Sequence, residues 1–158
     1  MNAASLKEIK TALEQLPPNE LLKICLRLSK FKKENKELVT YLLFDEADEP
    51  GYIASVKKSL ELIFEDVNTT NLYFAKKTIR KIVRTANRYI RYSSEPTTEV
   101  EILLFVAAQM QLLKIDFKKS TALHNIFLGL IKKIKKSIAS MHEDLQYDYL
   151  KELEALSS

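Results

Sequence analysis

Glycine and proline are scarce in this chain, and their scarcity limits the structures that it can form. The sequence contains only two glycines and four prolines, at Gly51, Gly129, Pro17, Pro18, Pro50 and Pro96. Tight hairpin turns and flexible ligand-binding loops depend on these two residue types. The sequence therefore favours long helices, and it contains neither G-x-G-x-x-G nor the phosphate-binding pattern G-x-x-x-x-G-K-[ST].

Cysteine and histidine are also few, which limits metal and nucleophilic chemistry. Cys25 is the single cysteine, so no disulfide can form within the chain. Cys25, His124 and His142 lack the close spacing of zinc ligands, and we predict no cofactor. Cys25 lies on the apolar side of its segment, which predicts a packed core thiol. His124 borders the apolar side of its own segment, where we predict a packing role with a hydrogen bond.

Long hydrophobic runs are absent as well. The longest apolar stretch, residues 100–113, is shorter than a membrane span and contains Glu101, Gln109 and Gln111. The first ten residues lack the apolar region of a signal peptide. We therefore expect a cytoplasmic protein that does not use a membrane as a partner.

The remaining composition is typical of a globular protein. Hydrophobic residues make up 46% of the sequence and charged residues 29%. A chain of this length buries roughly two thirds of its unfolded surface, so we predict one domain over residues 1–158. The formal net charge of +4 is too small to identify a nucleic-acid-binding protein by itself.

Apolar residues recur with helical spacing along most of the chain. Ser5 and Glu8 form a capping box before the first segment, and prolines begin several later ones. We predict helices over residues 6–16, 19–32, a short stretch after Asn35, 50–66, 71–92, 97–114, a stretch from about 121 to 139, and 142–156. An exposed acidic loop is predicted over Asp45–Gly51. The predicted fold class is all-α, with about eight antiparallel helices in a single helical bundle.

The apolar faces of these helices predict which side chains are buried. The centre of the 97–114 helix, LLFVAAQM, is apolar on nearly every side and is predicted to lie in the middle of the fold. Near the N-terminus the predicted buried faces are Leu21, Ile24, Cys25, Leu28 and Phe31, followed by Leu38, Val39, Leu42 and Leu43; in the last helix they are Leu145, Tyr149, Leu150 and Leu153. The series of helices that begin at proline is similar to the helix pairs of HEAT and armadillo repeats, which implies stacked antiparallel pairs. The spacing is irregular, and no repeat consensus matches residue by residue.

Residues 71–92 have the cleanest amphipathic pattern and the strongest local charge. Their apolar side consists of Leu72, Ala75, Ile79, Ile82, Val83, Ala86, Tyr89 and Ile90. The opposite side carries the candidate site, which we name the basic stripe: Lys77, Arg80, Lys81, Arg84, Arg88 and Arg91. Four of these six are arginines, whose planar guanidinium groups suit carboxylate and phosphate. Tyr73 and Tyr92, near the two ends, would add stacking surfaces if they are exposed.

The basic stripe has three interpretations. It is a solvated or internally neutralised helix face, an anchor for an acidic protein segment, or a surface for the phosphates of a nucleic acid. The acids that would neutralise it internally are Asp45, Glu46, Asp48, Glu49, Glu61, Glu65 and Asp66. We predict a non-enzymatic interaction or scaffold module that binds an acidic protein segment, with nucleic acid as the alternative partner. The sequence does not indicate the oligomeric state.

Paired carboxylates are the remaining enzymatic hypothesis. Glu61 and Glu65 stand one helical turn apart, and Lys57 precedes Glu61 by the same step. Ion pairs at this spacing are common on solvated helix faces and explain the pattern without catalysis. We therefore predict no catalytic residue and no enzymatic activity.

Overall fold

The all-α prediction is confirmed for residues 1–157, which the computed structural model describes apart from the side chains of Lys118 and Ser157. These residues form eight α-helices and no strand. The helices are α1 (Leu6–Glu14), α2 (Pro18–Phe31), α3 (Lys33–Thr40), α4 (Glu49–Glu65), α5 (Leu72–Ser93), α6 (Pro96–Leu112), α7 (Thr121–Ala139) and α8 (Glu143–Ser157). A π-helical turn over Tyr41–Asp45 follows α3, and a 3₁₀ turn over Phe117–Lys119 precedes α7. None of the helices in this part of the chain combines the length and the hydropathy needed to cross a membrane.

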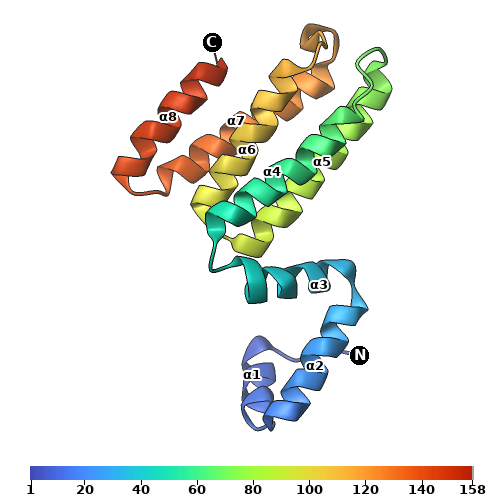
Figure 1. Cartoon of the computed structure of the whole chain (residues 1–158), viewed down its shortest axis with the longest axis vertical. Coiled ribbons are helices and arrows are strands. Elements are labelled where there is room, and N and C mark those ends of the chain that lie inside the picture. The colour runs from blue at the N-terminus through green and yellow to red at the C-terminus, as the bar shows by residue number, and fades with distance from the viewer. Residues whose placement is uncertain (158) are drawn as a thin grey trace. The chain divides into compact units, whose positions relative to one another are not determined.

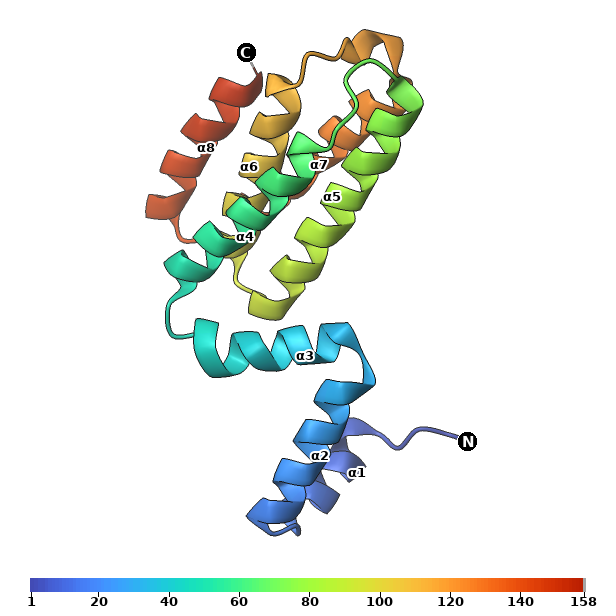
Figure 2. The same ribbon diagram turned by 45° about the vertical axis from the view of Figure 1, so that its right-hand side comes forward.

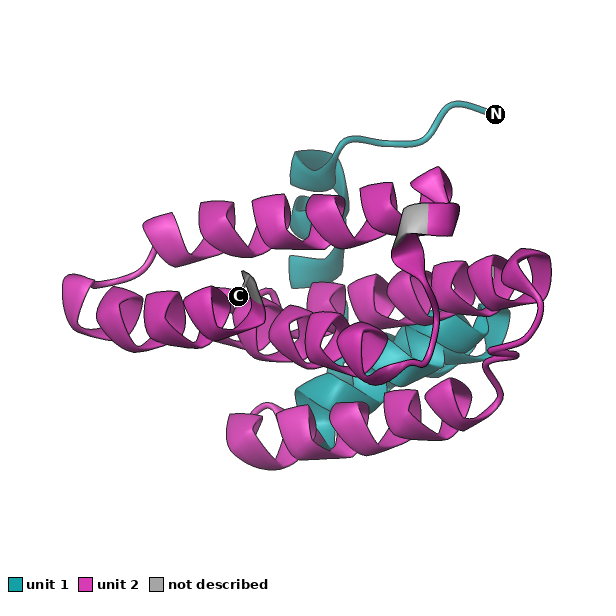
Figure 3. Cartoon of the chain, turned by 90° about the horizontal axis from the view of Figure 1, so that it is seen from above, with its two compact units in different colours: residues 1–44 teal, residues 45–158 magenta. Residues whose placement is uncertain are grey.

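The chain divides into two compact units, which Figure 3 colours separately. Unit 1 is Met1–Phe44 and unit 2 is Asp45–Ser158. The single domain over residues 1–158 and the stacking of helix pairs seen in HEAT repeats stay predictions.

In unit 2, α6 is the central helix of a bundle formed by α4–α8. It contacts α4, α5, α7 and α8. Figures 1 and 2 show that successive helices of this unit run in opposite directions. Buried side chains cover most of the α6 circumference: Thr98, Val100, Ile102, Leu103, Leu104, Val106, Ala107 and Met110. A helix that is apolar on all sides is stable in water only when other helices surround it, so the predicted central position is confirmed.

The other helices of unit 2 bury one face each, as amphipathic helices do. The buried residues are Tyr52, Ile53, Val56, Leu60 and Phe64 of α4; Ala75, Ile79, Ile82, Ala86 and Ile90 of α5; Leu123, Leu130, Ile131, Ile134 and Ile138 of α7; and Tyr149 and Leu153 of α8. The prediction for α8 was wrong in part, because Leu145 and Leu150 are exposed. Helix α8 packs mainly against α6 and α7, and these contacts cover a narrower face than the sequence pattern offers.

Polar contacts also join the helices of unit 2. The Lys57 Nζ of α4 lies 2.7 Å from Glu101 Oε2 of α6, and the Tyr149 hydroxyl of α8 donates to Glu101 Oε1 at 3.0 Å. Burial of Tyr149, and then the charge of Glu101, raise the pKa of the Tyr149 hydroxyl to about 12. One turn closer to the start of α6, the hydroxyls of Ser93 and Thr98 both donate to the Glu49 carboxylate. These bonds fix the positions of α4, α5, α6 and α8.

Unit 1 forms its helices where the sequence predicts them, with few tertiary contacts. The capping box is confirmed: the Glu8 amide donates to Ser5 Oγ at 3.3 Å, and the Ser5 amide donates to Glu8 Oε2 at 2.8 Å. Pro18 begins α2, as predicted. No residue of α1, α2 or α3 is buried.

The predicted buried faces of unit 1 were therefore wrong. Cys25 is exposed and is not a core thiol. Leu28 and Phe31 of α2 are 54% and 75% exposed, and Leu38, Leu42 and Leu43 are exposed as well. Apolar residues recur with helical spacing in these helices, but within unit 1 no helix covers the side that they form.

The predicted acidic loop over Asp45–Gly51 was also wrong in extent. The π-helical turn continues to Asp45, and α4 already begins at Glu49. Asp48 caps α4 by accepting a hydrogen bond from the Gly51 amide at 3.1 Å. Pro50 occupies the first turn of α4, where its missing amide hydrogen costs no helical hydrogen bond. The acids thus cap and begin a helix, and only residues 46–48 lie between the helical segments.

Candidate functional site

Helix α5 carries the candidate site, and both of its ends are well defined. The Asn71 side chain accepts hydrogen bonds from the amides of Tyr73 and Phe74, at 3.0 and 3.2 Å. At the other end Ser94 adopts the left-handed conformation, with φ at 59°, and its amide donates to the Ile90 carbonyl. The helix extends for 22 residues between these caps. It is a long support that orients its side chains in a regular pattern.

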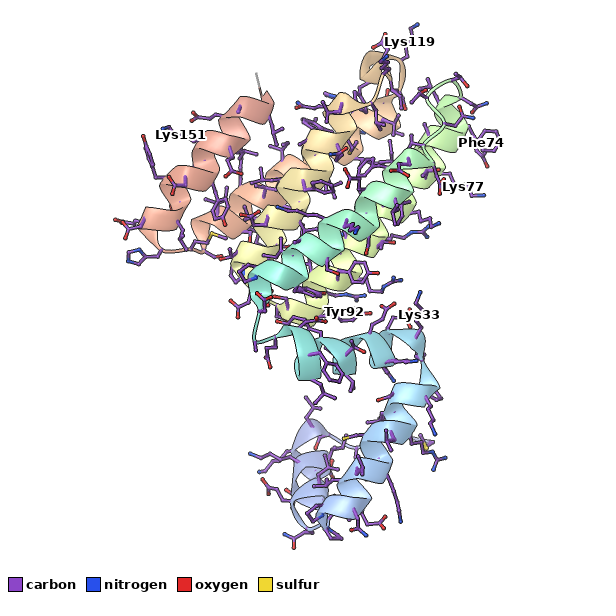
Figure 4. All side chains as sticks on the ribbon, in the orientation of Figure 1. Lys33, Phe74, Lys77, Tyr92, Lys119 and Lys151 are labelled. Atoms are coloured by element: carbon purple, nitrogen blue, oxygen red, sulfur yellow. The ribbon has the colours of Figure 1, made fainter. Side chains whose placement is uncertain are left out.

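The two faces of α5 separate as predicted. Ala75, Ile79, Ile82, Ala86 and Ile90 face the core. On the opposite side, five members of the basic stripe are exposed: Lys77, Arg80, Lys81, Arg84 and Arg91. Arg88 is half-buried, and its guanidinium carbon lies 5.3 Å from the centre of the Tyr89 ring. Figure 4 shows Lys77 and Phe74 extending outward from the N-terminal half of α5.

The five exposed cations of the stripe are not neutralised by the chain's own acids. Within residues 1–157 none of the five forms an ion pair or a side-chain hydrogen bond. Glu61 and Glu65, which were expected to balance the stripe, are exposed and do not pair with it. Glu49 instead accepts hydrogen bonds from Ser93 and Thr98. The positive charge of these five side chains is therefore available to an external anion.

A groove of about 530 Å³ runs along one flank of the basic stripe. We name it the α5 groove. It is lined by Tyr73, Lys76, Lys77, Arg80, Val83 and Arg84 of α5 and by Ile126 of α7. Three predicted residues, Lys77, Arg80 and Arg84, thus come together around one concave surface. Lys81, Arg88 and Arg91 do not line it.

The α5 groove combines positive charge with apolar and aromatic surface. Lys76 lies over the Tyr73 ring, with Nζ 5.9 Å from the ring centre. Tyr73 is 65% exposed, so most of this ring faces solvent. Val83 and Ile126 contribute branched aliphatic side chains. This chemistry suits a ligand that has both carboxylates or phosphates and an apolar group.

The candidate site predicted from sequence lacked three residues of the α5 groove: Lys76, Ile126, and Val83, which was predicted on the apolar side of α5. Lys76 was left out because it lies near the border between the apolar and basic sides of α5. Lys76, Arg80 and Arg84 follow each other at intervals of four residues, and this regular spacing could have identified Lys76. Ile126 comes from α7, so no spacing within α5 could have identified it as part of the site.

The other candidate groups are not arranged as a reaction centre. Lys57 pairs with Glu101 and not with Glu61, so the expected i, i+4 ion pair is absent from the described residues. His124 is exposed, and its predicted packing role was wrong because it lies outside the buried side of α7. His142 Nδ1 lies 3.5 Å from Asp144 Oδ2 in an exposed pair at the start of α8. Among the described residues, no three His, Cys, Asp or Glu side chains are grouped closely enough to hold a metal ion.

Comparison of the chain with known proteins finds no matching family model, no matching curated protein and no matching solved structure.

Proposed function

We propose that the chain is a non-enzymatic interaction module that binds an acidic protein segment in the α5 groove. The observation that carries this proposal is the grouping of Lys77, Arg80 and Arg84 with the aliphatic side chains Val83 and Ile126 in one concavity of about 530 Å³. The absence of internal ion pairs from the exposed stripe, within residues 1–157, supports an external anionic partner. Charge complementarity would then orient and select that partner.

The spacing of the cations indicates what the acidic segment looks like. Lys76, Arg80 and Arg84 follow each other at intervals of four residues, which places them roughly 6 Å apart along the axis of α5. A partner helix with acids at i, i+4 and i+8 presents carboxylates at the same interval. A leucine or phenylalanine between these acids would contact Val83 and Ile126 and contribute most of the affinity.

Nucleic acid is the second candidate, and one observation favours it. Arg80, Arg84 and Arg91 are exposed, and Tyr73 presents an open ring for base stacking. Phosphate binding would need neither Val83 nor Ile126, since counterion release supplies most of its free energy. The two candidates therefore differ in their dependence on salt and on the apolar part of the groove.

Three fluorescent probes separate the candidates: an acidic helical peptide with leucines between the acids, polyglutamate of equal charge, and a short RNA duplex. We expect the leucine-containing peptide to bind at micromolar concentration and polyglutamate to bind at least about tenfold more weakly. Tighter binding of the duplex, with a log–log salt slope of about −0.9 per phosphate contacted, would favour nucleic acid. No binding of any probe at low salt would contradict both candidates.

Arg80→Glu with Arg84→Glu tests the site itself. Both residues are exposed, so we expect the fold to persist, and far-ultraviolet circular dichroism checks this. Peptide affinity should fall by at least about tenfold, because two attractive charges become repulsive. Lys132→Glu with Lys136→Glu is the matched control: it reverses two exposed charges of α7 that do not line the α5 groove. Equal losses in both variants would indicate a response to net charge and not to the groove.

A further inference from the structure

Unit 1 exposes more large apolar side chains than its size explains. The exposed large apolar residues of α1 and α2 include Leu6, Ile9, Leu22, Ile24, Leu26, Leu28 and Phe31. Isolated apolar residues are normal on a protein surface, but several that share one face of a helix, as Ile24, Leu28 and Phe31 do by their spacing, indicate an interaction surface. The α5 groove contains no residue of unit 1, so this surface is independent of the proposed function.

The apolar residues of α1 and α2 follow one shared pattern. In α1 and the residues just after it they are Leu6, Ile9, Leu13 and Leu16; in α2 they are Leu21, Ile24, Leu28 and Phe31. Both sets have steps of three, four and three residues, the spacing of a seam between helices. Figures 1 and 2 show α1 and α2 side by side, joined by a short turn that contains Pro17. The two helices form a hairpin with one apolar stripe on each.

The hairpin leaves its apolar stripes incompletely covered. A groove of about 520 Å³ is lined by Leu6, Ile9, Lys10, Leu13 and Glu14 of α1 and by Leu21 of α2. Leu13 and Leu21 are half-buried, whereas Ile24 and Leu28 are exposed. A hairpin of two helices provides half of the core of a four-helix bundle. The missing half needs two more helices with the same seam spacing.

We infer that a second copy of this chain supplies them, so that two α1–α2 hairpins pair into a four-helix bundle. An identical hairpin carries the required 3-4-3 stripes, and twofold pairing is the commonest way in which identical chains associate. Unit 1 spans 44 residues, a size at which domains usually need disulfides, metals or oligomerisation. The single cysteine of the chain excludes an internal disulfide.

The charges of α2 complement each other in an antiparallel pair. Pairing through the α2 stripe places Leu21 beside Leu28 of the second copy, with Ile24 at the twofold axis. On the same flank, Glu20, whose carboxylate lies 2.8 Å from Lys23 Nζ of its own chain, then approaches Arg27 of the second copy, and the reciprocal pair forms on the other side of the axis. In a parallel pair, by contrast, Glu20 lies opposite Cys25 and Arg27 lies opposite Lys32, so this ion pair does not form. Cys25 follows Ile24 directly and is exposed, so the antiparallel arrangement brings the two Cys25 thiols close to the axis.

Light scattering of the full chain at micromolar concentration tests the pairing. We expect twice the 18.2 kDa mass of one chain for the natural protein, and the mass of one chain for Ile24→Glu with Leu28→Glu. Both substituted side chains are exposed, at 37% and 54%, so the change should leave the helices intact by circular dichroism. Leu62→Glu with Leu112→Glu is the matched control, since it adds the same charges at exposed apolar positions of unit 2 and should preserve the double mass.

A short bis-maleimide crosslinker tests the antiparallel arrangement, because it joins two thiols that lie close together. We expect a covalent dimer from the natural chain and none from Cys25→Ser. Leu128→Cys in the Cys25→Ser background moves the thiol to an exposed position in unit 2 and should remove the dimer as well.

Three results would overturn the inference. If the natural protein has the mass of one chain at every concentration, the dimer is excluded. If that monomer also cosediments with vesicles of phosphatidylcholine and phosphatidylserine, the apolar surface binds lipid. An unchanged double mass for Ile24→Glu with Leu28→Glu places the interface elsewhere. A dimer that does not crosslink through Cys25 excludes the antiparallel α2 pair.

Discussion

Units 1 and 2 both contain amphipathic helices, but the two units differ in how far the apolar faces of these helices are covered. In unit 2 every helix buries apolar side chains, and α6 is surrounded so completely that Leu103 and Val106 have no exposed surface. In unit 1 no residue of α1, α2 or α3 is buried. The comparison shows that an amphipathic pattern identifies the face that needs a partner, but it does not say whether the same chain provides one.

The difference follows from the number of elements available to each unit. In unit 2 four helices surround a central one, and this central helix, α6, contributes an apolar surface on all sides. Three short helices and a π-helical turn have no element that can serve as a centre. Burial of apolar surface is the main favourable term in folding, so unit 2 should dominate the stability of the chain.

The largest expected effect separates the two units directly. Leu103→Ala removes a fully buried side chain from the centre of unit 2, and we expect a loss of about 2–5 kcal/mol in the free energy of unfolding. Leu43→Ala makes the same chemical change at a 68% exposed position of unit 1, where we expect less than about 0.5 kcal/mol. Urea unfolding followed by circular dichroism measures both. Similar losses of unfolding free energy in the two variants would show that the Leu43 side chain is packed in a core.

A smaller effect is expected from the polar network that joins α4, α6 and α8. Tyr149→Phe removes the hydrogen bond to Glu101 and should cost about 0.5–1.5 kcal/mol. The pH dependence gives a sharper test. The folded-state pKa of Tyr149 is raised to about 12 from an ordinary value of 10.0, so the folded state holds this proton more tightly than the unfolded state does. The resulting stabilisation is present below pH 10 and is lost as pH rises from 10 towards 12.

Urea titrations of the natural protein and of Tyr149→Phe at pH 9, 10 and 11 measure this difference. The stability advantage of the natural protein should shrink as the pH increases, while other tyrosines and lysines affect both proteins alike. A constant or growing advantage would contradict the raised pKa.

The smallest effect concerns the capping box of unit 1. The Ser5 hydroxyl, and then the Ser5 amide, donate to the Glu8 carboxylate and hold its pKa below the usual value. Ser5→Ala removes one of these donors together with the cap of the Glu8 amide, so the pKa of Glu8 should rise. Amide exchange in the first turn of α1 should accelerate by about fivefold.

The folded-state pKa of Glu8 is lowered, so its stabilising contribution is present at neutral pH and is lost as pH falls through that value. Ser5→Ala should therefore weaken the acid dependence of exchange in α1, whereas exchange in α6 stays the same. A change in α6 exchange would show that the cap of α1 matters to unit 2.

Most helix boundaries could be predicted from local sequence because their causes are local. Ser5 with Glu8, Pro18, Asn71 and Pro96 each begin a helix through interactions with residues at most three positions away. The prediction failed over Asp45–Gly51, where a cluster of acids was interpreted as a loop. Asp48 is the N-cap of α4, and the composition of the segment does not distinguish a capping aspartate from a solvated one.

The candidate site was predictable only in part, because some of its residues come from another helix. The periodicity of α5 was sufficient to place Lys77, Arg80 and Arg84 on one face. The concavity beside them depends on Ile126, which comes from α7 and lies 42 positions beyond Arg84 in the sequence. The lack of internal ion pairs on the exposed stripe, within the described chain, likewise depends on where the acids of α4 point.

The sequence by itself determined the all-α class, the capped and proline-led helix starts, the central role of the 96–112 helix and the basic face of α5, because these depend on backbone propensity and on 3.6-residue periodicity. Only the tertiary structure decided that α1–α3 leave their apolar faces open, that Lys57 pairs with Glu101, and that Ile126 closes a groove beside Arg80 and Arg84. Each of these outcomes depends on which helices become neighbours. Neighbour choice is set by packing between segments that are distant in the chain, and no local pattern encodes it.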